Sequence, residues 1–372
     1  MLTAIGLMSG TSMDGIDAAM LRTDGEGKVE FGPAAFYPYA SAFRRDVERG
    51  LETAKAIVRR EDRPGNLAAL ERAITERHAE AVRSLIRSAP PEWKDVELVG
   101  FHGQTVLHRP QDALTVQLGD GQLLADATGI RVVYDMRAND MKAGGQGAPL
   151  VPAYHAALAR SLPSPYASKS PVVFVNIGGI SNITYVGEGD PIAFDTGPGN
   201  ALIDQWVARE GGVPFDADGA IASEGAVVHG VVERYLDRPF FAKAGPKSLD
   251  RGDFTLDEAE GLELADGART LATVSAEAVL KSVEQLPAPP GLWIVAGGGR
   301  KNPHILADLK RGAARMKGEV ILAEDVGLRG DFIEAEAWAY LAVRSLKKLP
   351  LTFPATTGCE HMVSGGILVK PV

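Results

Sequence analysis

Two short apolar runs at the start of the chain, residues 2–8 and 16–22, predict a pair of strands. The stretch that joins them, GLMSGTSMDGID, runs from Gly6 to Asp17. A hairpin turn needs only two small or polar residues, and this stretch holds about three times that polar content. The excess favours a loop that binds a ligand over a simple reversal of the chain.

Further along the first half, the apolar spacing predicts both helices and strands. Residues 40–90 repeat apolar side chains at helical spacing. Residues 96–106 predict a strand that runs into a Gly-Gln loop, and residues 130–136 predict another strand. Residues 143–162 predict a glycine loop that feeds a helix. This alternation is typical of an α/β protein.

The opening pattern returns in the second half of the chain. A Pro- and Ser-rich stretch at 163–171 is the best candidate for a linker. Residues 172–186 then predict a strand, a polar Gly/Ser/Asn turn and a second strand. Residues 191–207 and 292–312 each predict a strand, a glycine loop and a helix, and residues 332–346 predict a last helix.

Because a strand–polar turn–strand unit opens each half, the pattern predicts two related α/β domains with a cleft between them. The expected boundaries are 1–168 for the first lobe and 169–345 for the second. Residues 346–372 are expected to form a C-terminal segment that returns to the first lobe.

The 372 residues carry a formal net charge of -9, which argues against a broad polyanion-binding face. Neither nucleic acid nor a membrane is therefore an expected partner, although a small phosphate ligand needs only local donors. The single cysteine, Cys359, excludes an internal disulfide and a cysteine zinc cluster. No run approaches about 18 apolar residues and no signal peptide is apparent, so we expect a cytoplasmic protein.

Three junctions between a strand and a glycine segment hold most of the chemical information: Gly10–Gly15, Asp195–Asn200 and Gly297–Asn302. Glycine lets the backbone approach a ligand closely. The last two segments each feed a helix N-terminus, where unpaired N–H groups favour anions. Three such segments in one chain could surround a polyphosphate, although neither a P-loop nor a strand-linked G-x-G-x-x-G is present.

This arrangement resembles the actin-like ATPase superfamily, in which each lobe is ribonuclease-H-like, with a mixed sheet flanked by helices. SGTSMDGID, AFDTGPGN and VAGGGRKN resemble its two phosphate motifs and its adenosine motif. GLMSGTSMDGIDAA, FHGQTVLHRP, GGQGAPLVPAYH, VNIGGISNITYV, FDTGPGNALID and AGGGRKNPHI together resemble the anhydro-N-acetylmuramic acid kinases. The resemblance spans almost the whole chain and implies a kinase that uses ATP and Mg²⁺ and also hydrolyses the anhydro bridge of its sugar.

The resemblance implies that Asp140 is the catalytic base that activates a water molecule. Asp135 is expected to contact the substrate or orient the base, and Arg137 could pair with either carboxylate. His102, Gln104, Gly145, Gln146 and Glu334 are the other expected sugar-site residues, whereas His108 is expected to be structural.

The nucleotide-binding residues implied by the resemblance lie in the glycine segments. They are Gly10, Thr11, Ser12, Met13, Asp14, Gly15, Ile16, Asp17, Gly178, Gly179, Gly197, Gly199, Asn200, Gly297, Gly298, Gly299 and Asn302. Asp14 and Asp195 are alternative magnesium ligands, because Mg²⁺ prefers hard oxygen donors.

Two alternatives stay open from the residues alone. A kinase for another anhydro sugar, such as levoglucosan, would share these motifs. A chaperone-type or filament-forming actin-like ATPase would share the phosphate hairpins without needing a sugar base. Family members are often dimers, which leaves a homodimer open.

Overall fold

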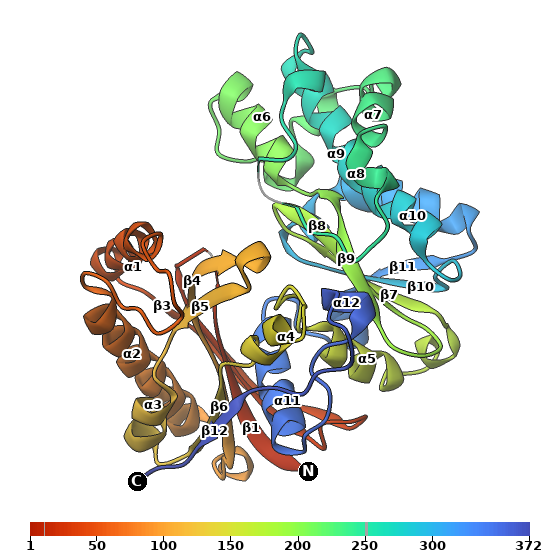
Figure 1. Ribbon diagram of the computed structural model, residues 1–372. Helices are drawn as coiled ribbons and strands as arrows, with labels where there is room; N and C mark the ends of the chain where they lie inside the picture. The colour runs from red at the N-terminus through yellow and green to blue at the C-terminus, as the bar shows by residue number, and fades with distance from the viewer. Residues whose placement is uncertain (11, 250–251) are drawn as a thin grey trace. The chain divides into compact units, whose positions relative to one another are not determined.

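The computed structural model describes residues 1–10, 12–249 and 252–372, and Thr11 lies outside these ranges (Figure 1). The chain divides into two compact units. The first unit comprises Met1–Ser161 together with Phe332–Val372, and the second comprises Leu162–Asp331. Each unit is an α/β fold built on its own mixed sheet, as the sequence predicts.

The sheet of the first unit has the order β12-β6-β4-β1-β2-β3, and β5 pairs with β4. Its strands β1 to β3 form an antiparallel meander, whereas β4 and β6 add to β1 in parallel. The strand bounds are β1 (Leu2–Ser9), β2 (Gly15–Thr23), β3 (Val29–Pro38), β4 (Leu98–Arg109), β5 (Leu114–Leu118), β6 (Arg131–Tyr134) and β12 (Ile367–Val369).

Helices cover both faces of this sheet because successive residues of β1 point to opposite sides. Ile5 and Leu7 pack with Val82 of α2 in one apolar cluster. On the opposite face Gly6 contacts α11 so closely that a Cβ atom there would lie 1.8 Å from the Ala335 carbonyl oxygen. The helices are α1 (Ser41–Ala54), α2 (Leu67–Ser88), α3 (Gly121–Thr128), α4 (Ala138–Lys142), α5 (Pro152–Arg160), α11 (Ile333–Leu346) and α12 (Pro354–Thr357).

The second unit repeats the same topology with the strand order β11-β10-β7-β8-β9. Again three antiparallel strands come first and two parallel strands follow beside the first of them. Its strands are β7 (Val172–Ile177), β8 (Ile180–Val186), β9 (Ile192–Pro198), β10 (Leu292–Ala296) and β11 (Glu319–Leu322). Its α-helices are α6 (Ala201–Gly211), α7 (His229–Leu236), α8 (Pro239–Ala242), α9 (Leu264–Lys281) and α10 (Pro303–Arg315). The predicted internal repeat is therefore confirmed at the level of topology.

Two details differ from the sequence predictions. The helix at 332–346 was expected in the second lobe, but as α11 it packs against β1, β2 and β4 of the first unit. The predicted Gly-Gln loop does not exist, because β4 continues through it with a register shift against β1. Gly103 makes this irregularity possible with a φ of 71°. No helix among the described residues is long and apolar enough to cross a membrane.

Candidate active site

The first polar stretch forms a tight hairpin between β1 and β2. The Met13 amide donates a hydrogen bond to the Gly10 carbonyl oxygen over 3.2 Å, and Met13 itself has a φ of 53°. The Ser12 hydroxyl donates to Asp14 Oδ1 over 2.6 Å. Ile16 is buried, whereas Ser12 and Asp14 are exposed, so the hairpin presents its polar groups to solvent.

A buried side chain from β4 fixes the start of this hairpin. Gln104 Oε1 accepts a hydrogen bond from the Ser9 hydroxyl over 2.5 Å, and Gln104 Nε2 donates to the Gly10 carbonyl oxygen over 3.0 Å. The Tyr39 hydroxyl lies 3.1 Å from the Ser9 hydroxyl. Both ends of the Gln104 amide therefore support the hairpin, and its predicted contact with a substrate stays a prediction.

Asp140 is buried near the start of the predicted glycine loop, on the short helix α4. It is 1% exposed. Its Oδ2 accepts a hydrogen bond from the Gly147 amide over 2.6 Å, and its Oδ1 accepts from the Thr357 hydroxyl over 2.7 Å. The Gln146 amide donates to the Thr357 carbonyl oxygen over 2.8 Å, which ties the loop to α12. The carboxylate is thus held in a single orientation by both segments.

Gly145 provides the room for this carboxylate. A Cβ atom at Gly145 would lie 2.2 Å from Asp140 Oδ2, closer than non-bonded atoms approach. The Gly145 amide also donates to the Asp140 carbonyl oxygen over 2.9 Å. The glycine at this position therefore serves packing around the carboxylate.

Arg137 and His102 lie on the other side of the Gly147 peptide. Arg137 Nη1 donates to the Gly147 carbonyl oxygen over 2.8 Å, and its Nη2 lies 3.1 Å from His102 Nε2. Because a guanidinium can only donate, His102 Nε2 accepts this hydrogen bond and the imidazole is neutral. Burial lowers the pKa of His102 well below its usual value, and the charge of Arg137 acts in the same direction.

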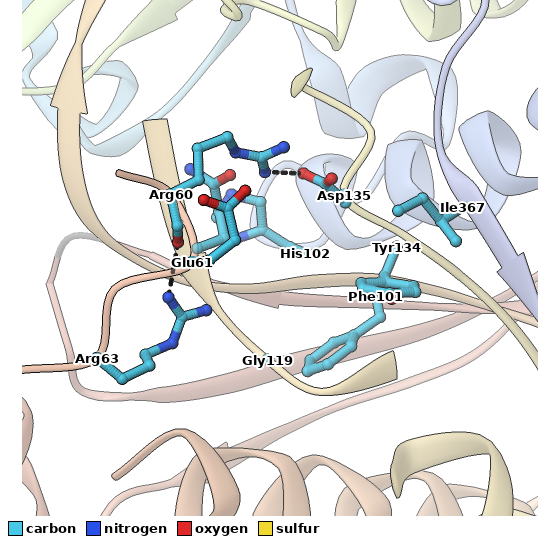
Figure 2. A pocket seen from close by; sticks show the side chains of 10 residues that line it. Arg60, Glu61, Arg63, Phe101, His102, Gly119, Tyr134, Asp135 and Ile367 are labelled. Carbon is cyan, nitrogen blue, oxygen red and sulfur yellow. Dashed lines mark hydrogen bonds and ion pairs between the residues drawn. The ribbon is translucent and has the colours of Figure 1, made fainter. Parts of the chain in front are cut away.

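Asp135 lines a separate cavity of about 310 Å³ in the first unit. Its carboxylate pairs with Arg60 over 2.5 Å, and its backbone adopts a φ of 55° (Figure 2). His102 lines this cavity as well as a second one of about 220 Å³ that Ser9, Gly10 and Arg137 border. His102, Gln104, Asp135 and Asp140 therefore belong to one region of the first unit.

Glu334 lies in the first turn of α11. Although it keeps an exposed surface, the protein packed around its carboxyl group disfavours the charged form and raises its pKa, and Arg137 opposes this shift. Arg137 and Glu334 therefore interact electrostatically, which places Glu334 near the same region. Its predicted contact with a sugar stays a prediction.

In the second unit, the polar turn after β7 meets the glycine segments Asp195–Asn200 and Gly297–Asn302. The Asn200 amide donates to the Gly178 carbonyl oxygen over 2.7 Å, and the Gly199 amide donates to the Gly179 carbonyl oxygen over 2.9 Å. A Cβ atom at Gly297 would lie 2.4 Å from Asn176 Oδ1. The turn after β7, the loop after β9 and the loop after β10 thus contact one another, and their binding of a nucleotide stays a prediction.

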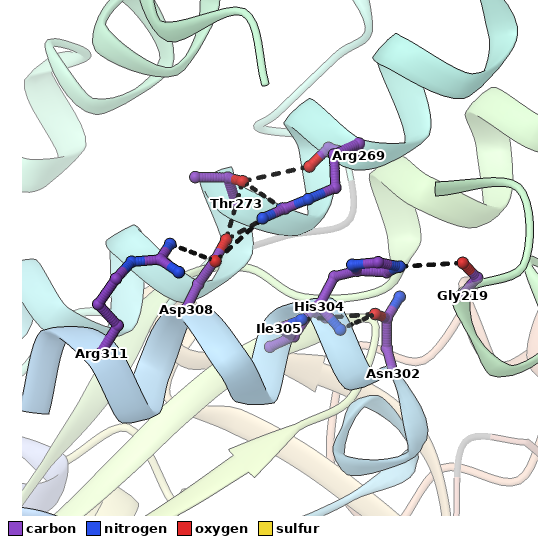
Figure 3. A network of polar contacts seen from close by, with 8 residues as sticks. All are labelled: Gly219, Arg269, Thr273, Asn302, His304, Ile305, Asp308 and Arg311. Atoms are coloured by element: carbon purple, nitrogen blue, oxygen red, sulfur yellow. Dashed lines mark hydrogen bonds and ion pairs between the residues drawn. The ribbon is translucent and has the colours of Figure 1, made fainter. Parts of the chain in front are cut away.

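A cavity of about 390 Å³ opens beside these loops, bordered by Asn200, Gly298 and Asn302. Asn302 caps α10, because its Oδ1 accepts from the His304 amide over 3.0 Å (Figure 3). Asp308, fully buried on α10, pairs with Arg269 of α9 over 3.0 Å. This network holds α10 and its capped N-terminus at a fixed place beside the cavity.

The two candidate magnesium ligands differ in their surroundings. Asp14 is exposed on the first hairpin. Asp195 Oδ2 accepts a hydrogen bond from the Leu249 amide over 2.8 Å, so Asp195 also orders the segment after Lys247. The described residues hold no group of three or more metal-ligating side chains.

Solved structures with similar chain paths include the ROK hexokinase of Thermus thermophilus, which covers 93% of this chain and 99% of its own at 13% identity and a TM-score of 0.46. Curated relatives are far more similar. Anhydro-N-acetylmuramic acid kinases of Agrobacterium fabrum and Brucella canis are 55% and 56% identical over 369 residues, which is 99% of this chain and 98% of each relative. The model of that family, Anhydro-N-acetylmuramic acid kinase, matches residues 2–371. The chain belongs to the anhydro-N-acetylmuramic acid kinase family.

Membership in the anhydro-N-acetylmuramic acid kinase family identifies the chain as a kinase that uses ATP. The structure shows that the cavity beside Asn200 is also lined by residues that the sequence analysis did not select. Phe215 and Asp216 border this cavity and lie outside the glycine motifs, whereas Lys301 lies within the segment Gly297–Asn302 but was not among the residues selected there. Thr357 was missed because it contacts Asp140 across 217 positions of the chain.

Replacing Gly199 with alanine tests whether ATP binding by this kinase needs the close contact between the loops around Gly178 and Gly199. A Cβ atom there would lie 2.2 Å from the Gly178 carbonyl oxygen, so the two loops must separate. We expect Gly199→Ala to raise the KM for ATP about tenfold or more, equivalent to the loss of about 1.4 kcal/mol of binding. Gly291→Ala is the matched control, because its Cβ atom would meet only ordinary contacts of 3.5 Å and beyond. A folded Gly199→Ala enzyme with an unchanged KM for ATP would contradict the assignment.

Proposed function

We propose that the protein phosphorylates O6 of 1,6-anhydro-N-acetylmuramic acid with ATP and opens the 1,6-anhydro bridge with water in the same reaction. The product is N-acetylmuramic acid 6-phosphate, a step that recycles cell-wall sugar. Family membership over residues 2–371 supports the substrate. The observation that carries the hydrolytic step is the buried carboxylate of Asp140, oriented by Gly147 and Thr357.

The chemistry explains why a base is needed although O6 has no proton to lose. In the anhydro sugar O6 is bonded to C1. A water oxygen forms the new bond to C1 while the C1–O6 bond breaks, and Asp140 takes the proton of that water. The electron pair released on O6 forms the bond to the γ-phosphorus, and the bond from that phosphorus to ADP breaks.

The hydrogen bonds of Asp140 suit this task. Each carboxylate oxygen accepts one hydrogen bond, from Gly147 or from Thr357, and retains a further lone pair. Ionised carboxylate oxygens with spare lone pairs can accept a proton from water without first breaking these bonds.

Each unit, considered by itself, contains glycine segments that we assign to contacts with the nucleotide. The hairpin from Gly10 to Gly15 and the loops around Gly178, Gly199 and Gly297 supply backbone donors for phosphates. The cavity of about 390 Å³ beside Asn200 and Asn302 is assigned to the adenosine part. Asp14 and Asp195 are the residues that would hold Mg²⁺, which neutralises phosphate charge when bound. ATP use supports a cytoplasmic location, and a homodimer stays a prediction.

Measuring ATP consumption with and without the sugar in water enriched in ¹⁸O tests this proposal. We expect ADP to form only when 1,6-anhydro-N-acetylmuramic acid is present, with one ¹⁸O atom at C1 of the product and none in its phosphate. Levoglucosan serves as the comparison substrate and is expected to react poorly. ATP hydrolysis that ignores the sugar would overturn the kinase assignment, and ¹⁸O in the phosphate would overturn the mechanism.

A further inference from the structure

Arg137 carries a charge that no carboxylate of the described residues neutralises by an ion pair. Asp135, one partner expected for it, pairs instead with Arg60. Asp140, the other, is bound by Gly147 and Thr357. The guanidinium of Arg137 instead donates hydrogen bonds to the Gly147 carbonyl oxygen and to the neutral His102 ring. Its Nε is buried without a hydrogen-bond partner among the described residues.

The surroundings of this guanidinium make the missing partner significant. The Trp338 ring lies 5.3 Å from its central carbon and offers only a weak cation–π contact. Burial lowers the pKa of Arg137 to about 10, while the more distant Glu334 and Asp140 carboxyl groups act in the opposite direction. Arg137 therefore stays protonated near neutral pH. Arg137 as a whole is half-buried, but a charged group that keeps a buried donor without a partner is costly unless a ligand compensates it.

The position of Arg137 identifies the kind of ligand. It borders the cavity of about 220 Å³ whose wall also contains Ser9 and Gly10, the first residues of the phosphate hairpin. The other described residues along this cavity include Thr105, His108 and Gln117, all without a formal negative charge at neutral pH. An anion that enters the cavity thus meets the first residues of the hairpin and, in the same wall, a guanidinium without an ion-pair partner among the described residues.

We propose that Arg137 is a further catalytic residue that donates hydrogen bonds to the γ-phosphoryl group of ATP as it passes to O6. This inference rests on the proposed function. The bond to ADP breaks and the bond to O6 forms as described above, and Arg137 forms no covalent bond. It offsets the negative charge on the equatorial oxygens of the transferring group, a task that arginine residues perform in other phosphoryl-transfer enzymes.

Comparing the affinities for an ATP analogue and for ADP distinguishes a γ-phosphoryl contact of Arg137 from a purely positioning role. Arg137 also holds the Gly147 peptide, so its loss could lower kcat through Asp140 alone. For Arg137→Met we expect a fall in kcat of about 10³-fold. We also expect the affinity for a non-hydrolysable ATP analogue, measured by calorimetry without sugar, to fall about 10- to 100-fold. Affinity for ADP, which lacks the γ-phosphate, should not change, and Arg137→Lys should restore part of the analogue affinity.

Arg131→Met is the matched control. Arg131 is the first residue of β6 and is half-buried, as Arg137 is. It also donates a hydrogen bond to a backbone carbonyl oxygen, that of Glu97, over 3.1 Å. It should bind both nucleotides as the unchanged enzyme does. If a folded Arg137→Met binds the ATP analogue normally, the γ-phosphoryl contact is wrong, and a selective loss of sugar affinity would assign Arg137 to the sugar carboxylate instead. Sugar-independent ATP hydrolysis by the unchanged enzyme would refute the proposed function, not this contact.

Discussion

Asp140→Asn is expected to reduce sugar phosphorylation by about 10²- to 10⁴-fold, the range that general bases contribute, while ATP still binds. The amide keeps the size of the carboxylate but cannot accept a proton from water at neutral pH. The water that attacks C1 then remains a weak nucleophile, and O6 is not released toward the γ-phosphorus. Steady-state rates of ADP release with saturating sugar and ATP measure this loss.

The contacts of Asp140 make this substitution compatible with the fold. In the Asp140→Asn variant, the oxygen of the new side-chain amide can face the Gly147 backbone amide, which only donates. The nitrogen of the new side-chain amide then faces the Thr357 hydroxyl, which can rotate to accept a hydrogen bond. Thermal unfolding should therefore change little. Asp126→Asn is the control, since Asp126 is an exposed acceptor on α3. Near-normal turnover by Asp140→Asn would remove Asp140 as the base.

The sequence predicted many helices and strands correctly, because each of them follows from the spacing of apolar residues within its own segment. The strands around the first hairpin, the helices between residues 40 and 90, and the strand–loop–helix segments of the second unit are confirmed. Strand β3 was missed, since Gly32 and Pro33 interrupt its pattern. The structure explains their tolerance: β3 is an edge strand, where proline costs no ladder hydrogen bond on the open side.

The placement of α11 shows what periodicity alone does not contain. Its apolar pattern predicts a helix but does not say which sheet it covers. The relevant signal is far away in the chain, at Gly6 and Gly100, where any side chain would collide with the backbone of α11. These glycines permit close packing against the first sheet, yet in the sequence they look like ordinary strand interruptions.

In the candidate site, too, local motifs could be predicted from the sequence, whereas contacts between distant residues could not. Glycine loops and Asp140 could be recognised from motifs that are continuous in the sequence. Partners that determine their geometry could not, since Gln104 lies 94 positions from Gly10 and Thr357 lies 217 positions from Asp140. Nor does the sequence show that Arg60, not Arg137, pairs with Asp135. The pairing follows from the loop between α1 and α2 reaching the end of β6.

Gly145→Ala is the second substitution with a large expected effect, because it displaces the base without altering its chemistry. The new methyl group would lie 2.2 Å from Asp140 Oδ2 and 2.6 Å from its Cγ, so the carboxylate or the loop must move. A shift of about 1 Å in a catalytic group costs about 10²-fold in rate. We therefore expect kcat to fall by about that factor, with little change in the KM for ATP, which the glycine segments determine.

Gly144→Ala separates this displacement from general damage to the loop. Gly144 has a φ of 78°, but its Cβ atom would approach Glu360 only to 3.7 Å. Alanine in that backbone conformation costs about 1–2 kcal/mol of stability without touching Asp140. Gly144→Ala should thus lower the unfolding temperature and largely keep kcat, whereas Gly145→Ala should lose kcat. Equal losses of kcat in both variants would mean that loop integrity, and not the space beside Asp140, limits the reaction.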